Sequence, residues 1–145
     1  MSNLVGTEVV EREIGRWAPS DLAFIRELRY DGDRATLEIE ALFQPRLSNV
    51  ECWPNRSGPF WRVTLQFEGI RQLRIAQNGT GDLQVGGFLL RDHSSSQMEG
   101  VTLQVADYEN GVVGFWALRV VVKACERLDT RPTSDPLATT RPGPA

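Results

Sequence analysis

The sequence predicts an all-β fold, an antiparallel β-sandwich or a flattened barrel, with one short N-terminal helix as an open alternative for the first residues. Two observations predict it. Apolar and polar residues alternate through most of the middle of the chain, which is the period of a strand with one buried face. Turn segments containing glycine separate these stretches at short intervals, as in sandwiches and barrels. We therefore expect about seven short strands.

Length and composition fit one domain. A chain of 145 residues can bury about two thirds of its surface around a single core. Apolar residues make up 41% and charged residues 24%, which is typical of a globular protein. We expect one β domain over residues 1–127. Residues 128–145 contain four prolines and few apolar side chains, so we expect a disordered, proline-rich tail there.

The first residues allow two interpretations. Val10, Ile14 and Trp17 share one face at helical spacing, whereas residues 9–14 would also serve as an edge strand. In either case we expect Pro19 to end the element, because proline lacks the backbone N–H.

The first alternating pair of segments predicts a hairpin. Phe24, Leu28 and Tyr30 precede Asp31-Gly32-Asp33, and Leu37, Ile39 and Ala41 follow it. Gly32 would supply the positive φ of a tight reversal, and the flanking aspartates would accept hydrogen bonds from nearby backbone amides.

The next segments continue the strand pattern. Trp61, Val63, Leu65 and Phe67 alternate with polar residues, which predicts a half-buried strand. A bulge or wider loop at Gly69 would lead to a second strand containing Leu73 and Ile75. Residues 83–90 would form another strand, interrupted at Gly86-Gly87 by a bulge that exchanges its faces.

Residues 101–122 predict a second hairpin. With Asn110-Gly111 as a two-residue type I′ turn, Val105 would pair with Trp116 and Asp107 with Gly114. This register collects one apolar face: Val101, Leu103, Val105, Trp116, Leu118 and Val120.

Charge and targeting signals limit the function classes. The net charge is −3 without a basic stripe, which argues against a nucleic-acid partner. The N-terminus resembles no secretory signal and no segment is long and apolar enough to cross a membrane, so we expect a cytoplasmic protein with no membrane partner. In that compartment Cys52 and Cys125 would be free, buried thiols.

Two carboxylates near the second turn form the first candidate site. Asp107 lies on the apolar face of its strand, so it would either contact a partner or cap amides of a neighbouring loop. Glu109 points the same way, nearer to water. A cation would need more oxygen ligands than these two residues offer, so we expect no metal and no cofactor. His93 is the only histidine and has no nucleophile in a catalytic pattern, which predicts a protein that is not an enzyme.

An aromatic loop forms the second candidate site. Trp53, Arg56 and Phe60 flank a stiff segment with two prolines, and these residue types anchor protein interfaces. They would bind a partner protein, or line a shallow groove for a sugar or a lipid headgroup. Trp61 continues the buried row of its strand and is not a candidate.

A resemblance adds a more specific expectation. The segments "DLAFIRELRYDGDRATLEIEALF", "FWRVTLQFEGIRQLRI", "LQVGGFLLRD" and "VADYENGVVGFWALRVVV", with a loop tryptophan between the first two, follow the order of strands and turns in small all-β bacterial immunity proteins. The sequence most resembles the immunity protein 50 family of polymorphic toxin systems. The resemblance implies a non-enzymatic protein that neutralises a cognate toxin. For a basic toxin, Asp31, Asp33, Glu38 and Glu40 would steer association.

Overall fold

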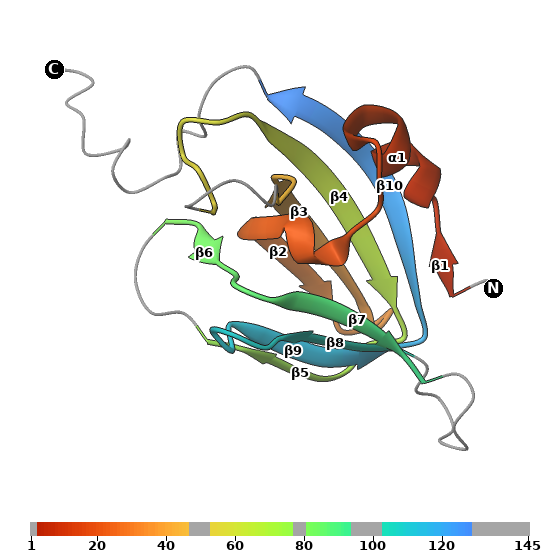
Figure 1. Cartoon of the computed structure of the whole chain (residues 1–145). Helices are drawn as coiled ribbons and strands as arrows, with labels where there is room; N and C mark the ends of the chain where they lie inside the picture. The colour runs from red at the N-terminus through yellow and green to blue at the C-terminus, as the bar shows by residue number, and fades with distance from the viewer. Residues whose placement is uncertain (1–2, 47–52, 77–80, 94–102, 129–145) are drawn as a thin grey trace, which may run out of the picture.

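Two β-sheets face each other in a computed structural model that describes residues 3–46, 53–76, 81–93 and 103–128 (Figure 1). The large sheet has the strand order β1 (Leu4–Val5), β10 (Arg119–Leu128), β4 (Phe60–Glu68), β3 (Thr36–Phe43), β2 (Leu22–Asp31) and β6 (Leu83–Gln84). The small sheet has the order β5 (Arg71–Ile75), β9 (Val113–Ala117), β8 (Leu103–Asp107) and β7 (Phe88–Asp92). The all-β prediction is confirmed, and of its two forms the structure is the sandwich, because the two sheets stay separate.

The core lies between the sheets. Side chains from both sheets form one buried cluster, in which Phe67 of β4 meets Phe115 of β9 edge to face at 4.9 Å between ring centroids. A second cluster covers one end of the opposite face of the large sheet, with Trp53 and Leu128 packed on it; its buried members are Ala23, Phe24, Leu42 and Phe60. The large sheet therefore buries side chains on both faces at that end.

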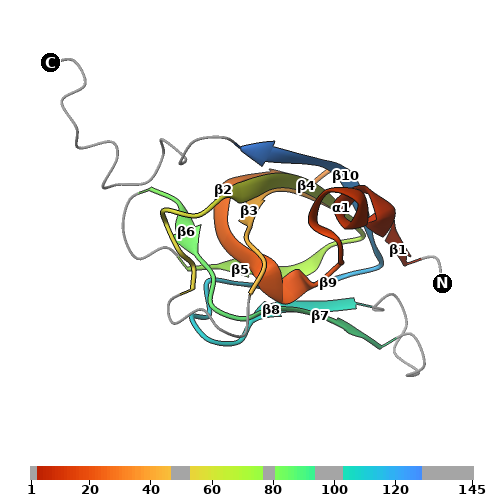
Figure 2. The ribbon, with the colours of Figure 1, turned by 45° about the horizontal axis from the view of Figure 1, so that its top comes forward.

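The N-terminal segment forms the helix α1 (Thr7–Ile14), so the helical alternative is confirmed and the edge strand is wrong. The helix ends at Gly15, which takes φ +97° and donates its N–H to the carbonyl of Glu11. The sequence predicted that Pro19 would end the helix. Instead, Pro19 begins the short 3₁₀ helix Pro19–Asp21. Val10 is fully buried, and α1 lies beside β10 where β1 joins the sheet (Figure 2).

The predicted hairpin of β2 and β3 is confirmed, with Leu28 opposite Ile39. Asp31 Oδ1 accepts hydrogen bonds from the N–H groups of Asp33 and Arg34, as expected. The positive φ belongs to Ala35, at 52°, and not to Gly32. The expectation for Gly32 was wrong because Asp31 pairs with Thr36, so the loop has four residues and its last one reverses the chain.

The chain passes between the two sheets four times. β4 and β5 lie in different sheets, so where a bulge or wider loop was expected the structure has a link across the sandwich, with Gly69 at φ +71°. The passage from β5 to β6 includes residues 77–80, which lie outside the described residues. Gly86-Gly87 interrupts residues 83–90 as predicted, but the interruption is the crossing from β6 to β7 rather than a bulge. Leu118 makes the last crossing, between β9 and β10.

The register of the second hairpin differs by one residue from the prediction. Val105 lies opposite Phe115 and Ala106 opposite Gly114, so the turn spans residues 108–112 rather than Asn110-Gly111 alone. The inward face holds Leu103, Val105, Phe115 and Ala117, and Trp116 turns outward. The wider turn is built around Asp107, whose role the alternation of residues does not reveal.

The last strand ends later than expected. β10 runs through Leu128, which was assigned to the tail, and residues 129–145 lie outside the described residues. No helix in the described part of the chain combines the length and the apolar character needed to cross a membrane.

Candidate functional site

The first candidate, Asp107, is buried, with 4% of its surface exposed. Its carboxylate accepts hydrogen bonds from five backbone N–H groups. The N···O distances to Oδ1 are 3.3 Å from Gly86, 3.0 Å from Gly87, 3.2 Å from Glu109 and 3.2 Å from Asn110, and the distance to Oδ2 is 3.2 Å from Val112. Of the two alternatives for Asp107, capping of amides is therefore the one the structure contains.

This arrangement leaves Asp107 out of any partner or cation site. Both oxygens face N–H groups, whose partial positive charge attracts an anion and repels a cation. The carboxylate joins the link between β6 and β7 to the turn between β8 and β9, so its work is structural. Glu109 is exposed, and its Cβ packs over Gly86, where a Cβ on the glycine would come within 2.8 Å.

The residues of the second candidate set gather at the second buried cluster, but they do not all reach the surface. Phe60 is 2% exposed and belongs to the second buried cluster, so its assignment to an interface was wrong. The side chain of Phe60 points to the face of the sheet opposite to that of Trp61, because successive side chains of a strand point to opposite faces. The guanidinium of Arg56 lies 4.9 Å from the centre of the Phe24 ring, over that cluster. Phe60 is therefore buried too deeply to line a surface groove together with Trp53 and Arg56.

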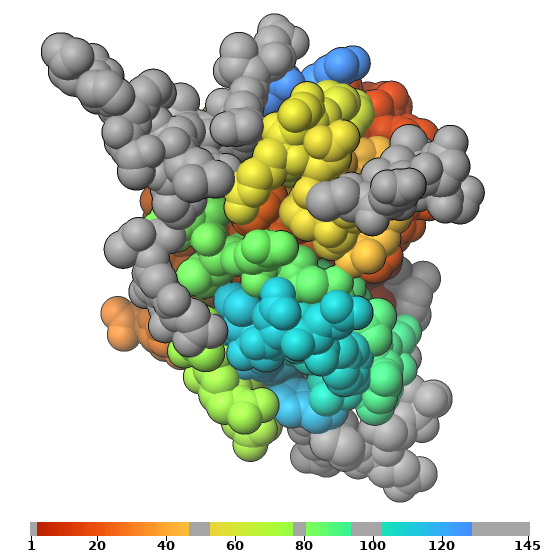
Figure 3. Space-filling view, turned by 60° about the vertical axis from the view of Figure 1, so that its left-hand side comes forward, coloured from red at the N-terminus to blue at the C-terminus, as the bar shows by residue number. Residues whose placement is uncertain are grey.

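A different pocket lies beside Trp53. It has a volume of about 230 Å³ and is lined by Gln44, Pro45, Trp53, Asn55, Gly58, Pro59 and Trp61. The segment that begins at residue 53, yellow in Figure 3, reaches the surface next to the green segment 81–93. Trp61, excluded as a candidate from sequence, lines this pocket. Its Nε1 is buried and has no hydrogen-bond partner among the described residues.

Gln44 holds the pocket together. Its side chain is largely buried; the Nε2 group donates to the carbonyls of Asn55, at 2.9 Å, and Pro59, at 3.2 Å, while Oε1 accepts from the N–H of Asn55 at 2.6 Å. Trp53 Nε1 donates to the carbonyl of Gln44 at 2.9 Å. Arg46 lies 3.5 Å above the Trp53 ring. Every polar group of the Gln44 amide is used inside the loop, which fixes the shape of the pocket.

Sequence reasoning missed Gln44 and Trp61. A signal for Gln44 existed: it is a polar residue placed between the end of a buried strand and Pro45. Trp61 gave no such signal, because its place in an apolar row predicts a core residue.

The outer face of the large sheet carries the remaining candidates. We define the charged face as the ion-paired residues of β2, β3, β4, β10 and the β2–β3 turn: Glu27, Arg29, Asp31, Arg34, Glu38, Glu40, Arg62, Glu68, Arg119 and Glu126. These are six carboxylates and four guanidinium groups. Asp31, Glu38 and Glu40, three of the acids expected from sequence to steer a partner, lie on this face, and exposed Asp33 lies in the adjoining turn.

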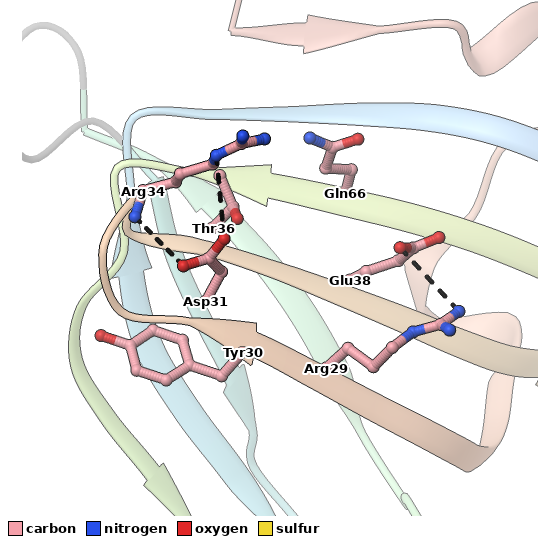
Figure 4. A pocket seen from close by; sticks show the side chains of 7 residues that line it. All are labelled: Arg29, Tyr30, Asp31, Arg34, Thr36, Glu38 and Gln66. Atoms are coloured by element: carbon pink, nitrogen blue, oxygen red, sulfur yellow. Dashed lines mark hydrogen bonds and ion pairs between the residues drawn. The ribbon is translucent and has the colours of Figure 1, made fainter.

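The acids of the charged face are paired rather than free. Arg29 lies 3.9 Å from Glu38. Arg62 of β4 lies 3.8 Å from Glu40 of β3 and donates a hydrogen bond to Glu126 of β10. The Glu126 hydrogen bond raises the pKa of Arg62. Figure 4 shows Arg29 and Glu38 pointing toward each other, in a shallow pocket of about 290 Å³ near the turn. The long-range electrostatic field of the acids on the charged face is therefore weaker than it would be without their arginine partners.

Two groups with reactive side chains lie elsewhere. His93 follows β7 and is half-buried; its Nε2 lies 3.2 Å from Gln104 Oε1, and its ring packs against Trp116. Cys125 is a free thiol, as expected, but it is half-buried rather than fully buried. Desolvation and, to a smaller extent, the charge of Glu13 raise its pKa to about 11. A thiol with that pKa is protonated at neutral pH and is a weak nucleophile. Cys52 lies outside the described residues.

Comparisons of the chain with protein-family models, curated proteins and solved structures return no match. The function must therefore be argued from the surface itself. Among the described residues, no group of three or more histidine, cysteine, aspartate or glutamate side chains could hold a metal ion.

Proposed function

We propose that the protein is a non-enzymatic binding protein of the cytoplasm whose charged face recognises a partner protein. The charged face carries this proposal. It extends over four neighbouring strands of the large sheet, while the small sheet packs against the opposite face. A sheet face with interleaved acids and arginines offers a pattern that another protein surface can match charge by charge.

The energetics of the charged face favour exchange with a partner. Exposed ion pairs contribute only about 0–1 kcal/mol each to stability, so a partner's lysines and arginines can replace the internal arginines at little cost. The surplus of two carboxylates over guanidinium groups selects a partner that is basic where it docks. The resemblance to bacterial immunity proteins supports a toxin as that partner, which the protein would neutralise by covering its active surface.

The central experiment is co-expression with the product of a neighbouring toxin-like gene. We expect a stable complex on purification and loss of toxicity in cells that express both proteins. Failure of the two proteins to associate, with toxicity unchanged, would remove the proposal.

A pair of charge reversals assigns the complex to the charged face. Glu38→Lys with Glu40→Lys removes two acids from its centre, and we expect binding to weaken by at least tenfold, mostly through slower association at low salt. The matched control, Glu8→Lys with Glu11→Lys, makes the same charge change on exposed positions of α1 and should leave binding within about twofold. Equal effects of the two double variants would contradict the assignment to this face. Thermal unfolding of each variant checks that the fold is intact.

A further inference from the structure

The pocket between Trp53 and Trp61 has features that the proposed function does not use. Two tryptophans and two prolines, Pro45 and Pro59, make its lining, and the Gln44 amide is fully engaged with the loop. Besides the Asn55 side chain, the lining includes Trp61, whose buried indole N–H has no acceptor within the described part of the chain. A buried donor without an acceptor is uncommon in a folded protein and indicates a missing partner.

The chemistry of this lining distinguishes between ligand classes. A sugar presents many hydroxyl groups, and each one placed in the pocket would need a hydrogen-bond partner, of which this largely apolar lining provides few. A polyproline II chain presents apolar rings and backbone carbonyls that have no internal hydrogen bonds. Aromatic-lined grooves bind such chains through ring packing, with few hydrogen bonds. A pocket of about 230 Å³ lies below the range of about 300–1,000 Å³ typical of sites that enclose a whole small molecule, and suits a short piece of such a chain.

The sequence of this chain contains a segment with that chemistry. Residues 129–145, "DTRPTSDPLATTRPGPA", include Pro132, Pro136, Pro142 and Pro144. They continue directly from β10, whose Arg127 pairs with Trp61 and whose Leu128 pairs with Phe60. The segment therefore starts next to the wall of the pocket.

The distance to be covered is short. A polyproline II chain rises about 3.1 Å per residue, so Pro132 lies within about 12 Å of Leu128 along the chain, and Pro136 within about 25 Å. Because the segment is attached to the domain, its effective concentration at the pocket is on the order of millimolar, which lets even a weak site be occupied.

We propose that the Trp53–Trp61 pocket is a binding site for proline-rich chain in the polyproline II conformation, and that its occupant is this protein's own segment 129–145. A carbonyl of the segment accepts the hydrogen bond from Trp61 Nε1, and its proline rings pack on the two indoles.

The test uses the full chain labelled with ¹⁵N at its tryptophans. The sequence has four tryptophans, so four indole N–H signals are expected, and Trp61→Phe and Trp53→Phe identify those of the pocket. Replacement of the four tail prolines by serine should shift the Trp61 and Trp53 signals and leave those of Trp17 and Trp116 in place. The control variant, with alanine at Thr133, Ser134 and Thr139, keeps every proline and should leave all four signals unmoved.

A synthetic peptide of residues 129–145, added to the proline-free variant, should return the Trp61 and Trp53 signals toward their original positions. Trp61→Phe in that background should weaken peptide binding roughly 2- to 10-fold, the net contribution of one hydrogen bond. Unmoved signals in the proline-free variant, together with no effect of the peptide, would overturn the proposal. Two further outcomes would also overturn it: signal positions that depend on protein concentration, which indicate a second copy as the occupant, and a response to an oligosaccharide but not to the peptide.

Discussion

At the scale of single residues, two aspartates have a structural role that their position in the sequence conceals. Asp107 binds five backbone amides, and Asp21, also buried, binds Arg16 through both of its oxygens and the N–H of Arg46. A carboxylate on an apolar face indicates a partner of some kind. Whether that partner is the chain itself or another molecule depends on loops whose paths cannot be derived from alternation.

Asp107→Asn tests the capping role. Asparagine keeps the shape but offers one acceptor oxygen, and its NH₂ group would face an amide N–H that it cannot bind. We expect the free energy of unfolding to fall by about 2–4 kcal/mol, the cost of leaving buried amides without a charged acceptor. Urea unfolding measures it. Asp33→Asn, at an exposed turn position, is the control and should change stability by less than about 0.5 kcal/mol.

Cys125 gives a second prediction at this scale. Because its pKa is about 11, the thiolate fraction at neutral pH is about 100-fold smaller than that of a thiol with the ordinary pKa of 9.0. Alkylation by iodoacetamide should be slow at pH 7 and rise about tenfold per pH unit toward pH 11, since the thiolate is the reacting form. Mass spectrometry of the peptide containing Cys125 follows the rate. A fast reaction that levels off near pH 8 would contradict the raised pKa.

At the scale of elements, strands were predictable and their connections were not. Alternation identified the segments of β2, β3, β4, β8 and β9, because burial of one face is a local property of the sequence. It did not reveal that Gly69 and Leu118 carry the chain between sheets, since a strand looks the same in either sheet. The register of β8 and β9 was missed by one residue because Asn110-Gly111 resembles a two-residue turn, while Asp107 stabilises a longer one.

The crossing at Gly69 gives a prediction for this scale. A Cβ on Gly69 would lie 2.6 Å from Leu118 Cγ, and the backbone is at φ +71°. Gly69→Ala should cost about 1–3 kcal/mol of unfolding free energy, measured by urea denaturation. Gly15→Ala is the matched control, because Gly15 also has a positive φ but no neighbour within 4 Å. Its smaller loss isolates the backbone strain, and Leu118→Ala should recover part of the loss in Gly69→Ala alone. Equal losses in the two single variants would show that the contact with Leu118 does not matter.

At the scale of the whole molecule, one core joins the two sheets. Strands of both sheets contribute side chains to the same large cluster, so the small sheet buries its apolar face only against the large one. The sandwich, as one of two predicted forms, and a helix, as one of two alternatives for the first residues, could be predicted. The pocket at Trp61 could not, since it depends on how a loop after β3 folds back over the end of the sheet.

The shared core predicts that the sheets unfold together. Phe67→Ala removes the ring that meets Phe115 across the sandwich and should lower the unfolding free energy by about 3–5 kcal/mol. Hydrogen exchange should show the same loss for slow amides of β3 and of β9. Tyr30→Ala, at an aromatic that is 54% exposed, is the control and should cost far less. Protection lost in the large sheet alone would mean that the sheets are independent units.

The N-terminal helix approaches β10 through a position with no side chain. Gly6 has φ +87°, and a Cβ there would lie 2.5 Å from the carbonyl oxygen of Val122. Any methyl group at position 6 would therefore push the helix off its strand. The acids and arginines of the exterior have no such constraint and can change as partners change. Among evolutionary descendants of this fold, that glycine should persist longer than the surface residues that give each member its target.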